Sequence, residues 1–122
     1  MGFQILIVDD SPPIRKCMRT YIELKTDWKV CGEAENGQVA IEKVKALNPD
    51  LVVLDMSMPV MNGLDAARQI RKTSPGLPVI MFTMYVSDQL SKAAKAVGVS
   101  EVLSKEAGLD DLLVSMRAAL IR

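Results

Sequence analysis

Two runs of four consecutive apolar residues constrain the fold of this chain more than any other feature. They lie at residues 5–8 and 51–54, and neither run alternates with polar residues. A strand with one solvent-facing side alternates, whereas a strand covered on both faces reads as a continuous apolar run. The two runs therefore predict strands of a parallel sheet that is packed between two layers of helices.

Short apolar runs and helical periodicity alternate five times along the chain. The predicted strands lie at residues 5–8, 30–34, 51–54, 79–82 and 102–103. Apolar residues at helical spacing predict helices from residue 12, over 38–47, 64–72 and 87–97, and from 109 to the end of the chain. This alternation predicts an α/β fold of the (βα)5 type, a doubly wound parallel sheet with helices on both faces.

Length and charge exclude several classes of protein. The chain has 122 residues, which predicts one domain over 1–122. Its 15 Lys and Arg balance its 15 Asp and Glu, so no nucleic-acid or membrane binding is expected. The chain shows no secretion signal and no run that could span a bilayer, so a cytoplasmic location is expected. Cys17 and Cys31 lack metal-ligand spacing and are expected to be small core residues.

Polar side chains follow four of the predicted strands. Asp9 and Asp10 follow the first strand, Asp55 the third, Thr83 the fourth and Lys105 the fifth. Ligands of doubly wound sheets bind beyond the carboxyl ends of the strands, so these side chains are expected to converge in one crevice. The chain contains no His, and any chemistry there depends on carboxylates, lysine, hydroxyls or metal.

Three converging carboxylates require a cation. Two like charges ~4 Å apart repel by about 4 kcal/mol at an effective dielectric of 20. Oxygen ligands favour Mg²⁺, and Mg²⁺ beside a lysine suits the oxygens of a phosphoryl group. In the absence of a Cys–His pair or a strained serine, the nucleophile would be a carboxylate that forms an aspartyl phosphate.

Four segments carry a resemblance to a known family. LIVDDS, PDLVVLDMSMPVMNG, VIMFTM and LSK resemble the receiver domain of bacterial two-component response regulators, and the likeness runs from Phe3 to Ile121. It implies the chemotaxis-regulator-like, flavodoxin-like fold with strand order 2-1-3-4-5. It also implies a histidine kinase or phosphotransferase as partner, and a domain that catalyses only its own phosphorylation and dephosphorylation rather than a turnover enzyme.

The resemblance also assigns the site residues. Asp55 would be the phosphoacceptor, with Lys105 pairing with the phosphoryl oxygens and Thr83 rotating to hydrogen-bond one of them. The Mg²⁺ ligands would be Asp10 directly, Asp9 through water, Asp55, and the backbone carbonyl of Ser57.

The sequence departs from the family at two positions. Val102 stands where the family often has Tyr or Phe, so either the switch works without an aromatic side chain or another residue such as Tyr85 serves it. Glu106 stands where a proline usually follows the lysine. The run Lys-Glu-Ala without proline, together with Thr-Met at the fourth strand, resembles the subfamily that precedes a LuxR-type helix-turn-helix. This likeness suggests transcription regulation through a C-terminal domain outside these residues.

The sequence is also compatible with two other functions. A degenerate receiver could act as an interaction scaffold, and an aspartyl phosphatase would need Asp-x-Asp, which the sequence lacks after the first strand. On the last helix, Val114, Ala118 and Ile121 form a second apolar stripe that predicts a homodimer face. Met56, Met58 and Met61 are expected to fill gaps in the core.

Overall fold

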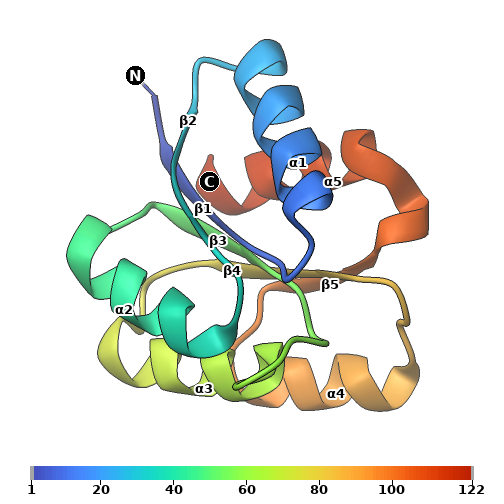
Figure 1. The fold of residues 1–122 in the computed structure, drawn as a ribbon. Helices are drawn as coiled ribbons and strands as arrows, with labels where there is room; N and C mark the ends of the chain where they lie inside the picture. The colour runs from blue at the N-terminus through green and yellow to red at the C-terminus, as the bar shows by residue number, and fades with distance from the viewer. Residues whose placement is uncertain (1, 122) are drawn as a thin grey trace.

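The computed structural model describes residues 2–121 and has the predicted topology, five parallel strands in the order β2-β1-β3-β4-β5 (Figure 1). The strands and helices alternate along the chain. Their bounds are β1 Gln4–Val8, α1 Pro12–Lys25, β2 Lys29–Ala34, α2 Gly37–Leu47, β3 Leu51–Leu54, α3 Gly63–Thr73, β4 Val79–Thr83, α4 Asp88–Ala96, β5 Glu101–Ser104 and α5 Gly108–Leu120. A 3-10 turn, η1, spans Lys105–Ala107.

Helices cover both faces of the sheet, with α1 and α5 on one face and α2, α3 and α4 on the other (Figure 1). Alternate residues of β1 and β3 enter the two separate cores. Ile5 and Ile7 face α1 and α5, whereas Leu6 and Val8 face the three other helices. The continuous apolar runs are thus confirmed as strands that are buried on both sides.

Four helices begin at the same edge of the sheet with a side-chain cap. A side-chain oxygen accepts a hydrogen bond from a backbone N–H of the first turn in each, and the capping residues are Ser11, Asn36, Asn62 and Ser87. In α1 the cap is followed by two prolines, whose fixed φ suits the first helical turn. Because each of these helices follows a strand, the carboxyl-end edge of the sheet is built from short, defined loops.

The opposite edge of the sheet carries an aromatic cluster. Trp28, just before β2, is 4 % exposed and meets the Phe3 ring edge-on, with 6.0 Å between ring centres. The guanidinium carbon of Arg117, in the last turns of α5, lies 5.4 Å from the centre of the Trp28 ring. The tryptophan therefore joins the start of the sheet to the end of α5.

Lys105 follows β5, as expected, and begins the 3-10 turn η1 that leads into α5. The expectation for the two cysteines was wrong. Cys17 is exposed rather than part of the core, and Cys31 is half-buried. Cys17 lines an open groove of about 240 Å³ between α1 and the start of α5, so no packed neighbour covers the thiol.

Other expectations about packing are confirmed. Met56, Met58 and Met61 pack against the core on the α2–α3–α4 side. Within residues 2–121, no helix combines the length and apolar character needed to cross a membrane.

Candidate functional site

Three carboxylates meet at the carboxyl-end edge of the two central strands. Asp9 and Asp10 follow β1, Asp55 follows β3, and these strands are neighbours in the sheet. One carboxylate oxygen from each of the three lies within 4.8 Å of the others. Asp9 is 1 % exposed and Asp55 5 %, whereas Asp10 is exposed and forms the solvent side of the cluster.

The backbone around Asp55 fixes its carboxylate. Its N–H donates to the carbonyl of Val8 at 2.9 Å, which extends the β1–β3 pairing by one residue. Its Oδ1 accepts from the N–H of Met56 at 2.8 Å. Gly63 at the start of α3 packs on the Asp55 carbonyl so closely that a β-carbon there would collide with it. The glycine lets the β3–α3 loop fold back over the site.

Lys105 bridges the two buried carboxylates. Its Nζ lies 2.7 Å from Asp9 Oδ2 and 3.3 Å from Asp55 Oδ2. Asp9 Oδ1 accepts from the N–H of Ser11 at 2.9 Å. Asp9 Oδ2 has no aligned hydrogen bond, because the lysine contact is close in distance but poorly directed. A buried carboxylate oxygen that lacks a directed partner is a suitable ligand for a cation or its bound water.

The charges of the site shift two pKa values. Burial, together with the charge of Asp9, raises the pKa of Asp55 above its ordinary value, although Lys105 and the Thr83 hydroxyl act against this. Burial acts to lower the pKa of Lys105, but its close contact with the Asp9 carboxylate and the charges of Asp55 and Asp9 outweigh it and raise the pKa. A single lysine does not balance the charge of three carboxylates, so the cluster attracts a cation. Carboxylate oxygens are ligands that Mg²⁺ prefers.

The structure brings together most of the predicted site residues, which are Asp9, Asp10, Asp55, Thr83 and Lys105. Thr83 is the last residue of β4 and is 3 % exposed. Ser57 lies in the exposed part of the β3–α3 loop, and its role as a carbonyl ligand stays a prediction. Val102 is half-buried against the core, whereas Tyr85 is 83 % exposed in the β4–α4 loop.

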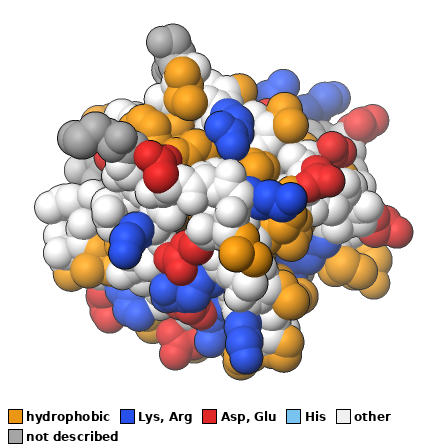
Figure 2. Space-filling view, turned by 90° about the horizontal axis from the view of Figure 1, so that it is seen from above, with side chains coloured by type: hydrophobic (Ala, Val, Ile, Leu, Met, Phe, Trp, Pro, Cys, Tyr) orange, Lys and Arg blue, Asp and Glu red, His pale blue; other side chains and the backbone are white. Residues whose placement is uncertain are grey.

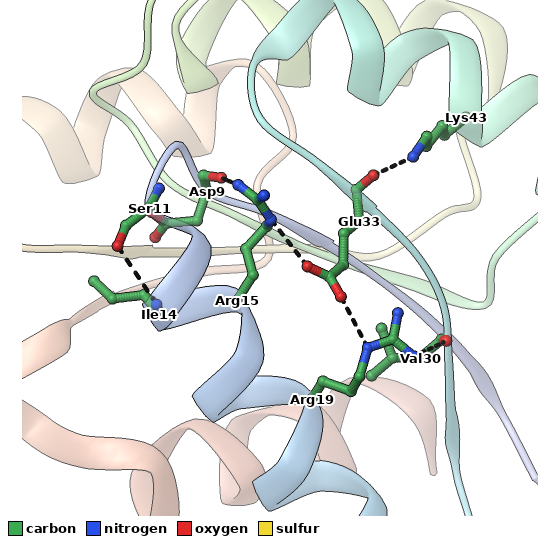
Figure 3. A network of polar contacts seen from close by, with 8 residues as sticks. All are labelled: Asp9, Ser11, Ile14, Arg15, Arg19, Val30, Glu33 and Lys43. Atoms are coloured by element: carbon green, nitrogen blue, oxygen red, sulfur yellow. Dashed lines mark hydrogen bonds and ion pairs between the residues drawn. The ribbon is translucent and has the colours of Figure 1, made fainter.

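An ion-pair network beside the cluster was not predicted (Figure 3). Glu33 on β2 accepts from Arg15 Nε at 2.9 Å and from Arg19 Nε at 2.8 Å, one oxygen for each arginine. The ammonium group of Lys43 donates to the backbone carbonyl of Glu33. The spacing of the two arginines, four residues apart on α1, was the available sequence signal, but such spacing is equally typical of a solvated helix face.

The β3–α3 loop contains an unusual turn that was also missed. The N–H of Met61 donates to the carbonyl of Pro59 at 2.7 Å, which closes a three-residue turn around Val60. Val60 has a φ of 68°, a conformation that is rare for a β-branched residue, and it is 82 % exposed. The loop beside the acidic cluster is therefore held in a strained conformation.

Comparison with known families identifies the relationship. The family model of the response regulator receiver domain matches residues 5–117. The chain belongs to the response regulator receiver domain family. The resemblance carried by the sequence motifs is confirmed, and the receiver domain is a component of two-component signalling.

Similar proteins include longer chains. Protein-glutamate methylesterase/protein-glutamine glutaminase 1 of Methanosarcina acetivorans is 41 % identical over 97 residues, which cover 80 % of this chain and 28 % of that protein. The response regulator protein VraR of Staphylococcus saprophyticus is 33 % identical over 117 residues, which cover 96 % of this chain and 56 % of that protein. This receiver thus spans about half of the second relative and less of the first.

A solved structure matches nearly the whole receiver. It is the CheX–CheY–BeF3–Mg²⁺ complex from Borrelia burgdorferi, with a TM-score of 0.90 and 28 % identity, and the match covers 98 % of this chain and 90 % of that chain.

Proposed function

We propose that this receiver is a phosphorylation switch in which Asp55 accepts a phosphoryl group from a histidine kinase or phosphotransfer protein. The observation that carries the proposal is the convergence of Asp9, Asp10 and Asp55, with Lys105 2.7 Å from Asp9 and 3.3 Å from Asp55. We assign the Mg²⁺ ligands to the three carboxylates and the carbonyl of Ser57. The switch would occupy the whole domain, residues 1–122, in the cytoplasm.

The transfer step follows from the chemistry of the carboxylate. An oxygen of Asp55 attacks phosphorus, the bond from phosphorus to the donor's imidazole nitrogen breaks, and the electron pair of that bond returns to nitrogen. Lys105 neutralises the phosphoryl oxygens as negative charge redistributes among them. Mg²⁺ would supply further neutralisation of those oxygens. Asp9 and Asp10 would hold the ion, and the burial of Asp55 would limit access of water to the acyl phosphate.

Thr83 couples phosphorylation to shape in this proposal. Its hydroxyl is near enough to Asp55 to lower the pKa of that carboxyl, and a phosphoryl group there would offer it a charged acceptor. A hydrogen bond to a charged group contributes ~1.5–3 kcal/mol, which is enough to shift a two-state equilibrium about tenfold or more. Because Val102 replaces the family's aromatic residue, we assign the readout to the β4–α4 loop, where Tyr85 is exposed.

The similar proteins support a role in signal transduction. VraR is described as a response regulator, and the Borrelia complex holds a receiver with BeF3 and Mg²⁺. We propose that this receiver regulates transcription through a C-terminal domain of the LuxR type. The methylesterase of M. acetivorans contains much sequence beyond the matched region, and we assign no esterase activity to this receiver.

Phosphorylation by a small donor tests the proposal directly. The protein is incubated with acetyl phosphate and Mg²⁺ and its intact mass is measured, with the addition of one phosphoryl group expected. Asp55→Asn should remove the label because an amide cannot form the acyl phosphate, whereas the matched exposed variant Asp88→Asn should keep it. Label that persists in Asp55→Asn would place the phosphosite elsewhere.

Two further measurements on the same protein, phosphomonoester hydrolysis and Mg²⁺ binding, separate the switch from the phosphatase and the scaffold. Turnover of a phosphomonoester would indicate an aspartyl phosphatase. A protein that neither takes the label nor binds Mg²⁺ would be an interaction scaffold.

A further inference from the structure

Arg15 joins the acidic cluster to β2. From the first turns of α1 its side chain reaches back to the preceding loop, where Nη1 donates to the backbone carbonyl of Asp9 at 2.6 Å. Its Nε donates to Glu33 Oε1 at 2.9 Å, and the side chain is only 16 % exposed (Figure 3). Arg15 thus contacts the acidic cluster through the backbone carbonyl of Asp9.

The carbonyl that Arg15 holds belongs to the peptide plane between Asp9 and Asp10. A peptide plane is rigid, so the direction of the Asp9 carbonyl sets the direction in which Asp10 leaves the strand. The N–H of Asp9 is bound to the carbonyl of Ala34 at 3.0 Å, which fixes the other side of Asp9. With both sides of Asp9 held, the orientation of Asp10 depends on the hydrogen bond from Arg15.

Glu33 holds Arg15 in this position. Its second carboxylate oxygen binds Arg19, and Lys43 binds its backbone carbonyl, so the acceptor is itself fixed on three sides. Although burial acts to raise the pKa of Glu33, the hydrogen bonds from Arg19 and Arg15 outweigh it and keep the pKa low, so the carboxylate is charged. A planar guanidinium between two fixed acceptors has a defined orientation.

We propose that Arg15 is a positioning residue that orients the Asp9–Asp10 peptide so that Asp9, Asp10 and Asp55 present their oxygens to one Mg²⁺, and that Glu33 keeps Arg15 in place. The inference rests on the Mg²⁺ site of the proposed function. It gives Arg15 a role that its charge would oppose, because a guanidinium near a cation site repels the cation.

The two possible effects of Arg15 on Mg²⁺ affinity have opposite signs, so a single substitution distinguishes them. If Arg15 acted only through its charge, Arg15→Gln would strengthen Mg²⁺ binding, whereas loss of a positioning contact would weaken it. Replacing residues that orient metal ligands typically costs about 10–100-fold in affinity, and we expect a loss of about tenfold for Arg15→Gln. The matched control is Arg19→Gln, which loses the same charge and the same partner, Glu33, but touches no part of the Asp9–Asp10 loop.

Mg²⁺ affinity is measured by calorimetry on the wild type and each variant, with thermal unfolding in the absence of Mg²⁺ recorded in parallel. We expect the Mg²⁺ affinity of Arg19→Gln to stay within about twofold of the wild type. Arg15→Lys keeps the charge but loses the planar guanidinium that binds two acceptors, so its Mg²⁺ affinity should also be lower than that of the wild type. Labelling of Asp55 in Arg15→Gln should approach the wild-type rate at saturating Mg²⁺, because Asp55 and Lys105 are intact.

Two outcomes would overturn the inference. Equal Mg²⁺ affinity in Arg15→Gln and wild type would remove the positioning role, and an equal loss in Arg15→Gln and Arg19→Gln would reduce the network to general support of the fold. If Arg15→Gln does not fold, Arg15→Lys provides the test, because it keeps the positive charge but cannot bind the Asp9 carbonyl and Glu33 with one planar group; wild-type Mg²⁺ affinity in this variant would overturn the inference. Failure of the wild type to bind Mg²⁺ would instead contradict the proposed function.

Discussion

Lys105 lies closer to Asp9 than to the proposed phosphoacceptor, with its ammonium nitrogen 2.7 Å from Asp9 Oδ2. The lysine therefore neutralises the Asp9 carboxylate at the position where a cation would act. Mg²⁺ that took over this neutralisation would leave the ammonium group to Asp55, 3.3 Å away. Lys105 would then pair mainly with Asp9 in the metal-free protein and with the phosphorylated Asp55 side chain after phosphoryl transfer.

Removing Lys105 should separate metal binding from phosphoryl transfer. We expect Lys105→Ala to slow labelling of Asp55 by acetyl phosphate by about a hundredfold, the scale on which loss of one charge-stabilising group acts. Mg²⁺ affinity, measured by calorimetry, should rise, because a positive charge next to the cation is removed. A parallel loss of metal binding and labelling would show that the lysine builds the site rather than acting on the phosphoryl group.

Thr83→Ala should leave labelling nearly unchanged and reduce the conformational response. The hydroxyl takes no part in bond formation, but it is near enough to Asp55 to affect the pKa of that carboxyl, which places it where a phosphoryl group would arrive. Amide hydrogen exchange of the β4–α4 loop with and without beryllofluoride measures the response, with Thr83→Ser as the control that keeps the hydroxyl. A full response in the alanine variant would remove Thr83 from the coupling.

The Glu33 network predicts a defined pH dependence of stability. The folded-state pKa of Glu33 lies below its ordinary value of 4.5, so its contribution is complete above that pH and disappears as pH falls through the folded-state pKa. We expect Glu33→Gln to lower the free energy of unfolding by about 1 kcal/mol at pH 7. The difference between wild type and variant, from urea unfolding, should shrink below pH 4.5. A difference that is independent of pH would exclude charge as its source.

The strained turn at Val60 should lower the stability of the protein, so a residue that accepts a positive φ there should raise it. Asn tolerates a positive φ better than a β-branched residue, so Val60→Asn should raise the free energy of unfolding by about 1 kcal/mol. Val60→Thr, which keeps the branch at the β-carbon, should show little change. The midpoint of chemical unfolding measures both variants. An equal gain in both would mean that removal of an exposed apolar side chain, rather than relief of strain, is the cause.

In the second apolar stripe, Val114, 68 % exposed, and Ala118 lie on the surface of α5 as predicted, whereas Ile121, 61 % exposed, lies just after the last residue of the helix. Figure 2 views the molecule from the side of α1 and α5, where apolar side chains lie among charges of both signs. We expect this stripe to form a homodimer face, so Ala118→Glu should lower the dimer content with beryllofluoride while labelling of Asp55 persists. Sedimentation compares it with Ala46→Glu on α2, on the other face of the sheet. Equal behaviour of the two variants would contradict the assignment.

The sequence predicted the topology and the main site for the same physical reason. Buried strands read as continuous apolar runs, and parallel strands bring the residues after them to one edge. Asp9 and Asp55, which lie far apart in the chain, could therefore be placed together before any contact was known. The order of the strands came from the family resemblance and is confirmed.

The features that were missed depend on contacts between elements. Arg15 and Glu33 meet because Glu33 pairs with Ile7 in the β1–β2 register, which no local pattern encodes. Cys17 fits the apolar stripe of α1, but its exposure depends on where η1 places the start of α5. The φ of Val60 follows from closure of the β3–α3 loop over Asp55, whereas its own preference is for extended backbone.

The position of Trp28 gives the protein an intrinsic optical reporter. It is the single tryptophan in the sequence, and it lies before β2, at the sheet edge opposite the acidic crevice, under the guanidinium of Arg117. Its emission therefore reports on the packing of the last turns of α5 rather than on the ligands of the crevice. A change in that emission on phosphorylation would show that a structural change at Asp55 reaches the opposite edge of the sheet.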